Sequence, residues 1–374
     1  MIKKYKHKII LNEFANDLKH QGYFAVDPHC HTSFSYDVPD VKQTSPEMLV
    51  KKQESLGLMP LISDHDTLNG YNYLMSRKKQ KVIPAAEITI IPKTANLISF
   101  KKPLHALHIN VFQLDNEQLA ILEDLASKQD LDEFIRFLRQ EDLDYMYNHP
   151  FWCETNEKLN WRAIPGLVKN YFDVIELNAG RPKNLNDLTL YIAEQFNKGI
   201  ASASDTHTND PGNAYTLAEG KNFRDFWQNV KESRFYVVRE DMTPFTIMRQ
   251  SGAMISNIFR ANINAHKERS FTPASGVRAL DILFKSVTSG SLKDKLFIKK
   301  TMNMMLQSVN YTAGPVLFWK LYLSKEISYG ENVKEKIVKL TSSLKAFDNK
   351  INSKIHLNKN NYKKYPSMVE HIKN

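Results

Sequence analysis

Two His and two Asp lie close together near the N-terminus, in the segment VDPHCHTSFSYD. Asp27, His29 and His31 are spaced two residues apart. Side chains at this spacing share one face of a β-strand, so these three would converge while Cys30 points to the other face. Such a cluster could bind a metal ion, or it could be a polar strand end without function, because a short His motif alone is a weak signal.

Clusters of His and acidic residues recur through the first 210 residues, at or near the ends of short apolar runs. They comprise seven of the 12 His and seven acids: His29, His31, His65, His105, His108, His149 and His207, with Asp27, Asp37, Asp64, Asp66, Glu87, Glu176 and Asp205. Burying carboxylates without partners is costly, and bound divalent cations remove that cost. Mixed imidazole and carboxylate ligands suit zinc, manganese or iron, and so many ligands predict two or three ions.

The elements that position these residues are seven apolar runs, from YFAV at 23–26 to GIASA at 199–203. Segments with helical spacing lie between them, for example 45–57, 116–142 and 184–199. Alternating strands and helices predict parallel βα units. Reactive groups at nearly every strand end favour an α/β barrel over an open sheet, in which the site gathers at one switch point.

Seven motifs in this order resemble a known family: DPHCHTSFSYD, SDHDTLNG, AAE, HINVF, NHP, IELN and ASDTH. Over about residues 22–240 the chain is similar to PHP-domain (polymerase and histidinol phosphatase) metallohydrolases. The resemblance implies a distorted (β/α)7 barrel with a two- or three-metal centre that hydrolyses phosphate esters. It also implies nine metal ligands, of which Glu87 bridges two ions: His29, His31, Asp37, His65, Glu87, His108, His149, Asp205 and His207.

Two of these ligand assignments have alternatives. Asp37 lies six residues after His31, whereas many relatives carry a ligand five residues after it, where this chain has Tyr36. The segment LHALHINVF offers two His, and the family pattern favours His108 over His105.

The candidate catalytic residues are Asp64, Asp66 and Arg181. Asp64 and Asp66 flank His65, where they could orient an imidazole or cap the following helix. Arg181 follows a strand end and could hold a substrate phosphate with two hydrogen bonds, or be a surface residue. Glu176 could support the metal ligands from a neighbouring strand.

Three regions are predicted: an N-terminal extension at 1–21, the metallohydrolase barrel at 22–244, and a basic helical region at 245–374 with a fraying tail. The net charge of the chain is +10, and the last region holds 22 Lys and Arg against 8 Asp and Glu. Such a region could attract nucleic acid or an acidic membrane surface, or present solvated Lys-rich helix faces.

Composition narrows the setting of the protein. No apolar run approaches the roughly 18 to 20 residues that span a bilayer, and the apolar stretch near the N-terminus is too short for a signal peptide. Cys30 and Cys153 are the two cysteines of the chain and make no disulfide framework. We therefore expect a reducing compartment, the cytoplasm.

The predicted activity is metal-dependent hydrolysis of a phosphoester, with a small phosphate monoester or nucleotide as the favoured substrate and nucleic acid second. Two other functions stay open at this point. One is an amidohydrolase-type hydrolase, because related barrels share these ligand types. The other is a non-catalytic module that binds nucleic acid or a protein partner through the basic region.

Overall fold

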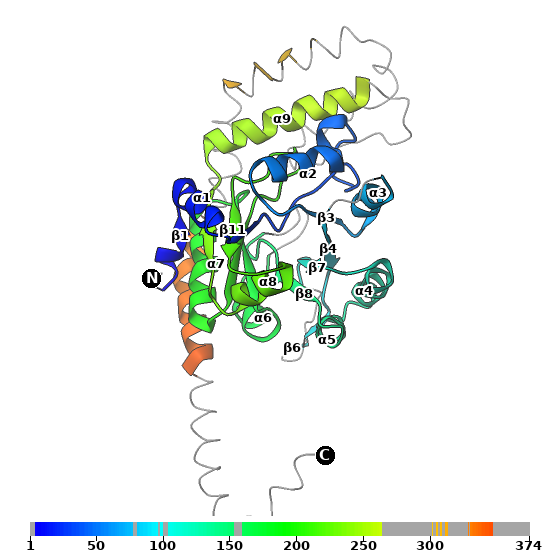
Figure 1. Cartoon of the computed structure of the whole chain (residues 1–374). Coiled ribbons are helices and arrows are strands. Elements are labelled where there is room, and N and C mark those ends of the chain that lie inside the picture. The colour runs from blue at the N-terminus through cyan, green and yellow to red at the C-terminus, as the bar shows by residue number, and fades with distance from the viewer. Residues whose placement is uncertain are drawn as a thin grey trace, which may run out of the picture.

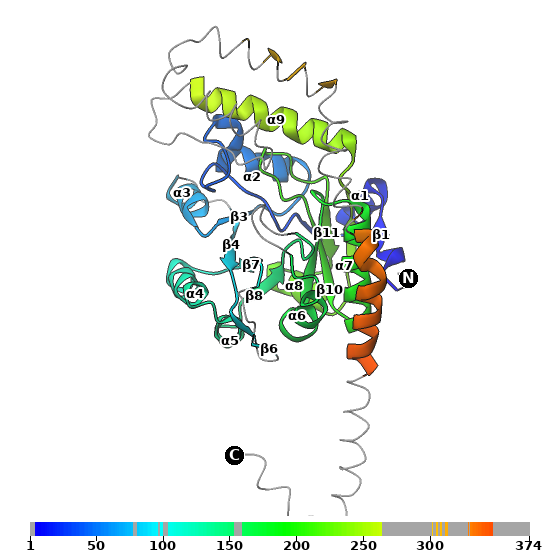
Figure 2. The same cartoon turned by 180° about the vertical axis from the view of Figure 1, so that it is seen from behind.

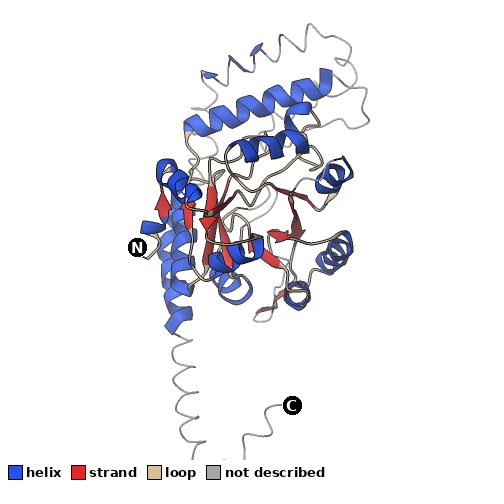
Figure 3. Cartoon of the chain, viewed as in Figure 1, coloured by secondary structure: helices blue, strands red, loops and turns tan. Residues whose placement is uncertain are grey.

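The computed structural model describes residues 4–77, 81–95, 98–99, 104–152, 159–263 and, near the C-terminus, chiefly 330–346. These residues form an α/β fold with strands inside and helices around them (Figures 1 and 3). Cys153 and much of the predicted basic region, including 264–300 and 347–374, lie outside the described residues.

A curled six-stranded sheet lies at the centre of the molecule, with the strand order β10-β9-β8-β7-β4-β3. Its strands are β3 (Leu61–His65), β4 (Ile83–Ile90), β7 (Leu107–Phe112), β8 (Asp144–Tyr147), β9 (Val174–Asn178) and β10 (Gly199–Ala203). Each of the seven predicted apolar runs contains a strand. The first of them, β2 (Phe24–Val26), belongs to a second sheet.

The direction of β7 differs from the prediction of parallel units. β7 is antiparallel to both β4 and β8, whereas β3 and β4, β8 and β9, and β9 and β10 pair in parallel. A parallel crossover needs a dozen or more residues and usually a helix. Between β4 and β7 the described residues instead form the paired strands β5 (Thr94–Ala95) and β6 (Ile98–Ser99). Strand and helix do not alternate here, so the described residues do not form a ring of seven parallel strands.

The second sheet has four strands in the order β1-β12-β11-β2, with β1 (Ile9–Ile10), β11 (Tyr215–Ala218) and β12 (Tyr236–Val238). Beyond β2 the chain is not a regular strand. It crosses between the edge strand β3 and the segment after β10. Ser63 N donates to Cys30 O at 2.9 Å, and His31 N donates to Thr206 O at 3.1 Å. These bonds connect the two edges of the six-stranded sheet at the end where the His gather.

Helices surround the sheets. They are α1 (Asn12–His20), α2 (Pro46–Ser55), α3 (Asn69–Arg77), α4 (Asn116–Lys128), α5 (Leu131–Gln140), α6 (Ile164–Tyr171), α7 (Lys183–Phe196), α8 (Phe223–Lys231) and α9 (Pro244–Ile263), with 3-10 turns at Lys6–Lys8 and Lys42–Thr44. Ser45 caps α2 as the sequence predicts, because its side chain accepts from Met48 N.

The single helix predicted over 116–142 is two helices. Gln129 adopts a left-handed conformation with φ 61°, which ends α4. Asp130 then caps α5 by accepting from the backbone N–H groups of Asp132 and Glu133. The apolar periodicity of the two helices hides this break.

Helical residues 330–346 contribute to the same hydrophobic core as the sheets. Val333 and Ile337 are buried in the core together with Leu185 and Leu188 of α7. Figures 1 and 2 show this stretch alongside α7 from opposite sides. In the part of the chain that the structure describes, no helix has the length and apolar character needed to cross a membrane.

Gly199, at the start of β10, packs against α8 so closely that an added Cβ would lie 2.4 Å from Val230 O. We expect Gly199→Ala to lower the free energy of unfolding by about 1–3 kcal/mol, because backbone on both sides must shift. Gly166 on α6 is the matched control, since nothing lies within 4 Å of its Cβ position. Urea denaturation followed by circular dichroism measures both variants. Equal midpoints for the two would contradict the close packing of β10 on α8.

Candidate metal centre

Glu87 on β4 is a buried carboxylate, 1% exposed, at the centre of a cluster of imidazoles. Nitrogens of three imidazoles lie 2.9, 3.2 and 3.3 Å from its Oε2, and nitrogens of two others lie 3.0 and 3.3 Å from its Oε1. The first three belong to His29, His31 and His65, and the other two to His108 and His149. Each carboxylate oxygen therefore faces its own group of imidazoles.

His29 and His31 reach the cluster from the irregular segment after β2. Their Nε2 atoms lie 3.0 Å apart. Cys30 between them points away and is buried among apolar side chains such as Leu49 and Ile62. The alternation predicted for these three residues is therefore found, although the backbone there is held by hydrogen bonds to β3 and Thr206 rather than by a regular strand.

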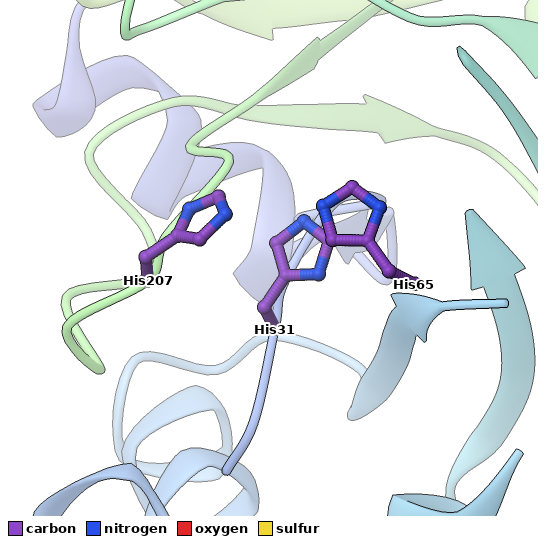
Figure 4. Close-up of side chains that lie close together, drawn as sticks. All are labelled: His31, His65 and His207. Atoms are coloured by element: carbon purple, nitrogen blue, oxygen red, sulfur yellow. The ribbon is translucent and has the colours of Figure 1, made fainter. Parts of the chain in front are cut away.

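A second group of ligands lies next to these two imidazoles. Asp205 Oδ1 is 3.4 Å from Nε2 of both His29 and His31, and His207 Nε2 is 2.6 Å from Asp37 Oδ2. The rings of His31, His65 and His207 lie side by side, although they come from three separate segments (Figure 4). His65 Nε2 is 3.3 Å from the same Oδ2 of Asp37.

Neighbouring polar groups orient the ligands. Glu176 on β9 is fully buried; its Oε1 accepts from His29 Nδ1 at 2.8 Å and its Oε2 accepts from His149 N at 2.7 Å. An ionised carboxylate only accepts, so Nδ1 of His29 carries a proton and its Nε2 is directed at the cluster. Asn178 donates to both Glu176 and Asp205, at 3.1 and 3.0 Å.

Two ligands sit on backbone that L-residues rarely adopt. His149 has φ 28° and Asp205 has φ 52°. Strained positions of this kind persist only where the surrounding structure holds them, and they concentrate at functional sites. The hydrogen bonds of Glu176 to His149 N and of His29 O to Asp205 N supply that restraint here.

The charges in the cluster are strongly coupled. Burial lowers the pKa of His29, but Glu87, Asp205 and Glu176 raise it by more, so the net pKa lies well above the ordinary value. Burial raises the pKa of Glu87, and the imidazoles around it bring the net pKa well below the usual range. Without a cation these groups balance one another as ion pairs. A divalent ion would replace imidazole protons, because metal ligands must be deprotonated.

The donor set fits divalent metal ions. Four overlapping groups of three residues place one ligand atom each within 4.8 Å of the others: His31, His65 and His207; His29, Glu87 and His149; His29, His31 and Asp205; and His65, Glu87 and His108. Among the described residues, Asp37 Oδ1 is buried and has no hydrogen-bond partner. Imidazole and carboxylate donors at this density match zinc, manganese or iron better than calcium or magnesium.

The structure thus brings together all nine residues that the sequence motifs predict as ligands. His108 contacts Glu87, whereas His105 lies behind the cluster with its Nε2 3.2 Å from the Tyr147 hydroxyl. Burial of His105 lowers its pKa to about 4. Asp37 faces the imidazoles, while Tyr36 in the alternative position is 63% exposed, with its ring centroid 4.8 Å from that of His65.

Three acids near the motifs do not face the imidazoles. Asp27 accepts from the backbone N–H groups of Ser204 and Gly212, both at 3.0 Å. Asp64 accepts from N and Oγ1 of Thr32, at 2.6 and 2.8 Å, which holds the loop after His31. Asp66 Oδ1 accepts from Thr89 N at 3.2 Å. These carboxylates position backbone segments, and the printed hydrogen bonds of all three are to residues other than His.

Arg181 lies at the edge of the cluster through an aromatic residue that the sequence did not single out. Its guanidinium carbon is 4.9 Å from the ring centroid of Trp152. The Trp152 ring contacts His108 and His149 edge to face, with centroids 5.3 and 5.0 Å apart. The position of Trp152 three residues after His149 was the available signal.

Asn148 and Ser35 were also missed. Asn148 Nδ2 donates to Glu87 Oε1 at 2.8 Å, and the Ser35 hydroxyl lies 3.3 Å from His31 Nδ1. Asn148 lies next to His149 in the motif NHP, so its place in the motif was the signal for it. Nothing in the local sequence marks Ser35, because its contact depends on how the loop after His31 folds.

No family model and no curated protein sequence matches the chain. Two solved structures are similar to it. One is a proposed metal-dependent phosphoesterase from Bifidobacterium adolescentis, with 17% identity and a TM-score of 0.38 over 49% of this chain and 88% of that one. The other is the lesion-specific endonuclease PfuEndoQ from Pyrococcus furiosus, with 15% identity and a TM-score of 0.41 over 57% of each chain. At these scores neither similarity carries an argument about function.

Glu176 offers a test of the metal centre that leaves every proposed ligand in place. We expect Glu176→Gln to weaken zinc or manganese binding by about 10- to 100-fold, because the amide can no longer accept from both His29 and His149. Titration of chelator-treated protein with each metal, by calorimetry, measures the change. Glu54→Ala on the exposed face of α2 is the control. Unchanged affinity in Glu176→Gln would show that Glu176 does not set the orientation of His29.

Proposed function

We propose that this chain is a metal-dependent phosphoesterase whose centre holds two or three divalent ions, zinc, manganese or iron. The observation that carries the proposal is the position of Glu87, whose two oxygens face different groups of imidazoles and so suit a bridge between two ions. The ligands would be His29, His31, Asp37, His65, Glu87, His108, His149, Asp205 and His207. The order of the sequence motifs supports the same assignment.

When bound, ions of this kind neutralise charge on a phosphate and lower the pKa of water. The remaining tasks fall to residues of the chain. Arg181 would bind the phosphate, because its guanidinium offers two parallel donors and its contact with Trp152 restricts the orientations it adopts. Asp64 and Asp66 would act as positioning residues, through their bonds to Thr32 and Thr89.

The favoured substrate is a small phosphate monoester or a nucleotide, with nucleic acid second. The proposal includes the three regions at 1–21, 22–244 and 245–374. Nucleic acid would bind through the basic third region, where 22 Lys and Arg face 8 Asp and Glu in the sequence. Much of that region lies outside the described residues.

Metal content and activity test the proposal together. Protein purified without chelator should contain two or three divalent ions per chain and hydrolyse an aryl phosphate. Chelation, His65→Ala and Glu87→Ala should each abolish hydrolysis, because each removes ions or their ligands. His20→Ala, on the exposed side of α1, should leave both properties unchanged.

Elemental analysis and a coupled phosphate assay provide the readouts. Substoichiometric metal together with no hydrolysis of any phosphoester would overturn the proposal. A parallel panel of amides and carboxylic esters separates it from an amidohydrolase-type activity. Hydrolysis of an amide or ester faster than of every phosphoester would favour that alternative.

Arg181 should affect binding of the phosphate more than the metals. We expect Arg181→Ala to reduce kcat/KM by about 10- to 100-fold, chiefly through KM, and Arg181→Lys to recover only part, because Lys is a point charge without the planar fork. Metal content should not change. Arg224→Ala, an exposed residue of α8, is the matched control. Wild-type kinetics in Arg181→Ala would remove this residue from the site.

A further inference from the structure

A cavity of about 250 Å³ adjoins the proposed metal centre, between the loop after β10 and helix α9. Residues 205–208 form one wall, and they include the proposed ligands Asp205 and His207. Gln250, Ser251 and Met254 of α9 form the other wall. A group attached to a phosphate at the metal centre would therefore meet α9. Figure 1 shows α9 crossing the molecule above the sheets.

The chemistry of the cavity is that of uncharged hydrogen-bonding groups. Apart from the two proposed metal ligands, its wall offers the hydroxyls of Thr206, Thr208 and Ser251, the amide of Gln250 and one thioether. Ser251 donates to Ile247 O at 2.6 Å, so its hydroxyl oxygen still has capacity to accept from a ligand. None of the described residues that line the cavity is Lys or Arg.

The nearest Arg on α9 does not supply positive charge to this cavity. Arg249 lies beside Gln250 in sequence, but its guanidinium contacts two carboxylates. Its Nε is 2.8 Å from Asp210 Oδ2, and its Nη2 is 2.9 Å from Glu240 Oε2. Two acids thus offset the single cation. A second phosphate, as in a polynucleotide backbone, would find no free charge to pair with at this wall.

The size of the cavity limits the group that can enter. At about 30 Å³ for each water in the liquid, this volume corresponds to roughly eight waters. That is below the roughly 300–1,000 Å³ of pockets that enclose drug-sized ligands. A sugar or short polyol fits this space, and its hydroxyls both donate and accept, as the wall requires.

From these observations we infer that the cavity between residues 205–208 and α9 binds the alcohol part of the substrate, and that this alcohol is a small, uncharged polyol or sugar. The inference rests on the proposed phosphoesterase function and narrows its substrate class. Gln250 and Ser251 would be the residues that determine specificity, because they hydrogen-bond the alcohol without contacting the phosphate.

The first test compares two sets of primary alkyl phosphates under the same metal conditions. One set is glycerol 1-phosphate, ribose 5-phosphate and glucose 6-phosphate, and the other is ethyl and propyl phosphate. At least one polyol ester should be hydrolysed with a kcat/KM about tenfold or more above that of ethyl phosphate, since unfilled buried polar groups discriminate strongly. Equal values for the two sets, or faster cleavage of a single-stranded oligonucleotide, would overturn the inference.

Variants on α9 form the second test. Gln250→Ala and Ser251→Ala should each lower kcat/KM for the preferred polyol ester by about five- to tenfold and leave ethyl phosphate within about twofold of wild type. Ser251→Phe, which fills the cavity, should exclude the polyol ester and spare ethyl phosphate. Gln228→Ala on exposed α8 is the matched control. Metal content, measured for each variant, should stay at the wild-type level.

The outcomes distinguish the two proposals. Hydrolysis of ethyl phosphate with no effect of the α9 variants on either ester set overturns the role of the cavity and leaves the phosphoesterase standing. Equal losses on both sets have the same meaning, because α9 would then act on the centre as a whole. No hydrolysis of any ester by metal-loaded protein overturns the phosphoesterase and the cavity inference together.

Discussion

The burial of Glu87 is the constraint on which the rest of this site depends. A carboxylate that is 1% exposed loses its hydration, and that loss is unfavourable by several kcal/mol unless positive charge or hydrogen bonds replace the water. Five imidazoles and Asn148 surround its two oxygens. Protons on the imidazoles or divalent ions can neutralise it, so binding of metal is coupled to release of protons. Both states need the same convergence of side chains.

That convergence sets the geometry of the surrounding strands. β4 carries Glu87 between β3 and β7, and the antiparallel direction of β7 brings His108, near its start, to the level of Thr89 on β4. On the far side, Glu176 ties His29 to His149 through its two oxygens. The positive φ angles of His149 and Asp205 then turn these ligands inward. Local backbone strain is therefore balanced by hydrogen bonds that link separate strands.

The sequence predicted the parts of this arrangement that depend on local pattern. Apolar runs that end in His and acids located the seven strands, and alternation placed Cys30 away from the imidazoles. Features that depend on contacts between distant segments were not accessible. The direction of β7 follows from a connection without a helix, and Asp27 turns toward Ser204 and Gly212 because those backbone N–H groups lie beside it. Trp152 shows its role only through the ring contacts it makes after folding.

The ligands alone cannot select a substrate, because every phosphoester presents the same charged oxygens to them. Selection must come from groups at the rim that meet the rest of the molecule, and those groups lie outside the sheet. On one side Arg181 rests on Trp152; on the other, α9 faces residues 205–208. The pairing of Arg249 with Asp210 and Glu240 makes the α9 side close to neutral, although the sequence of the C-terminal region is strongly basic. Net charge over a region therefore does not predict the charge that a substrate meets at the site. The local pairing of each cation decides it.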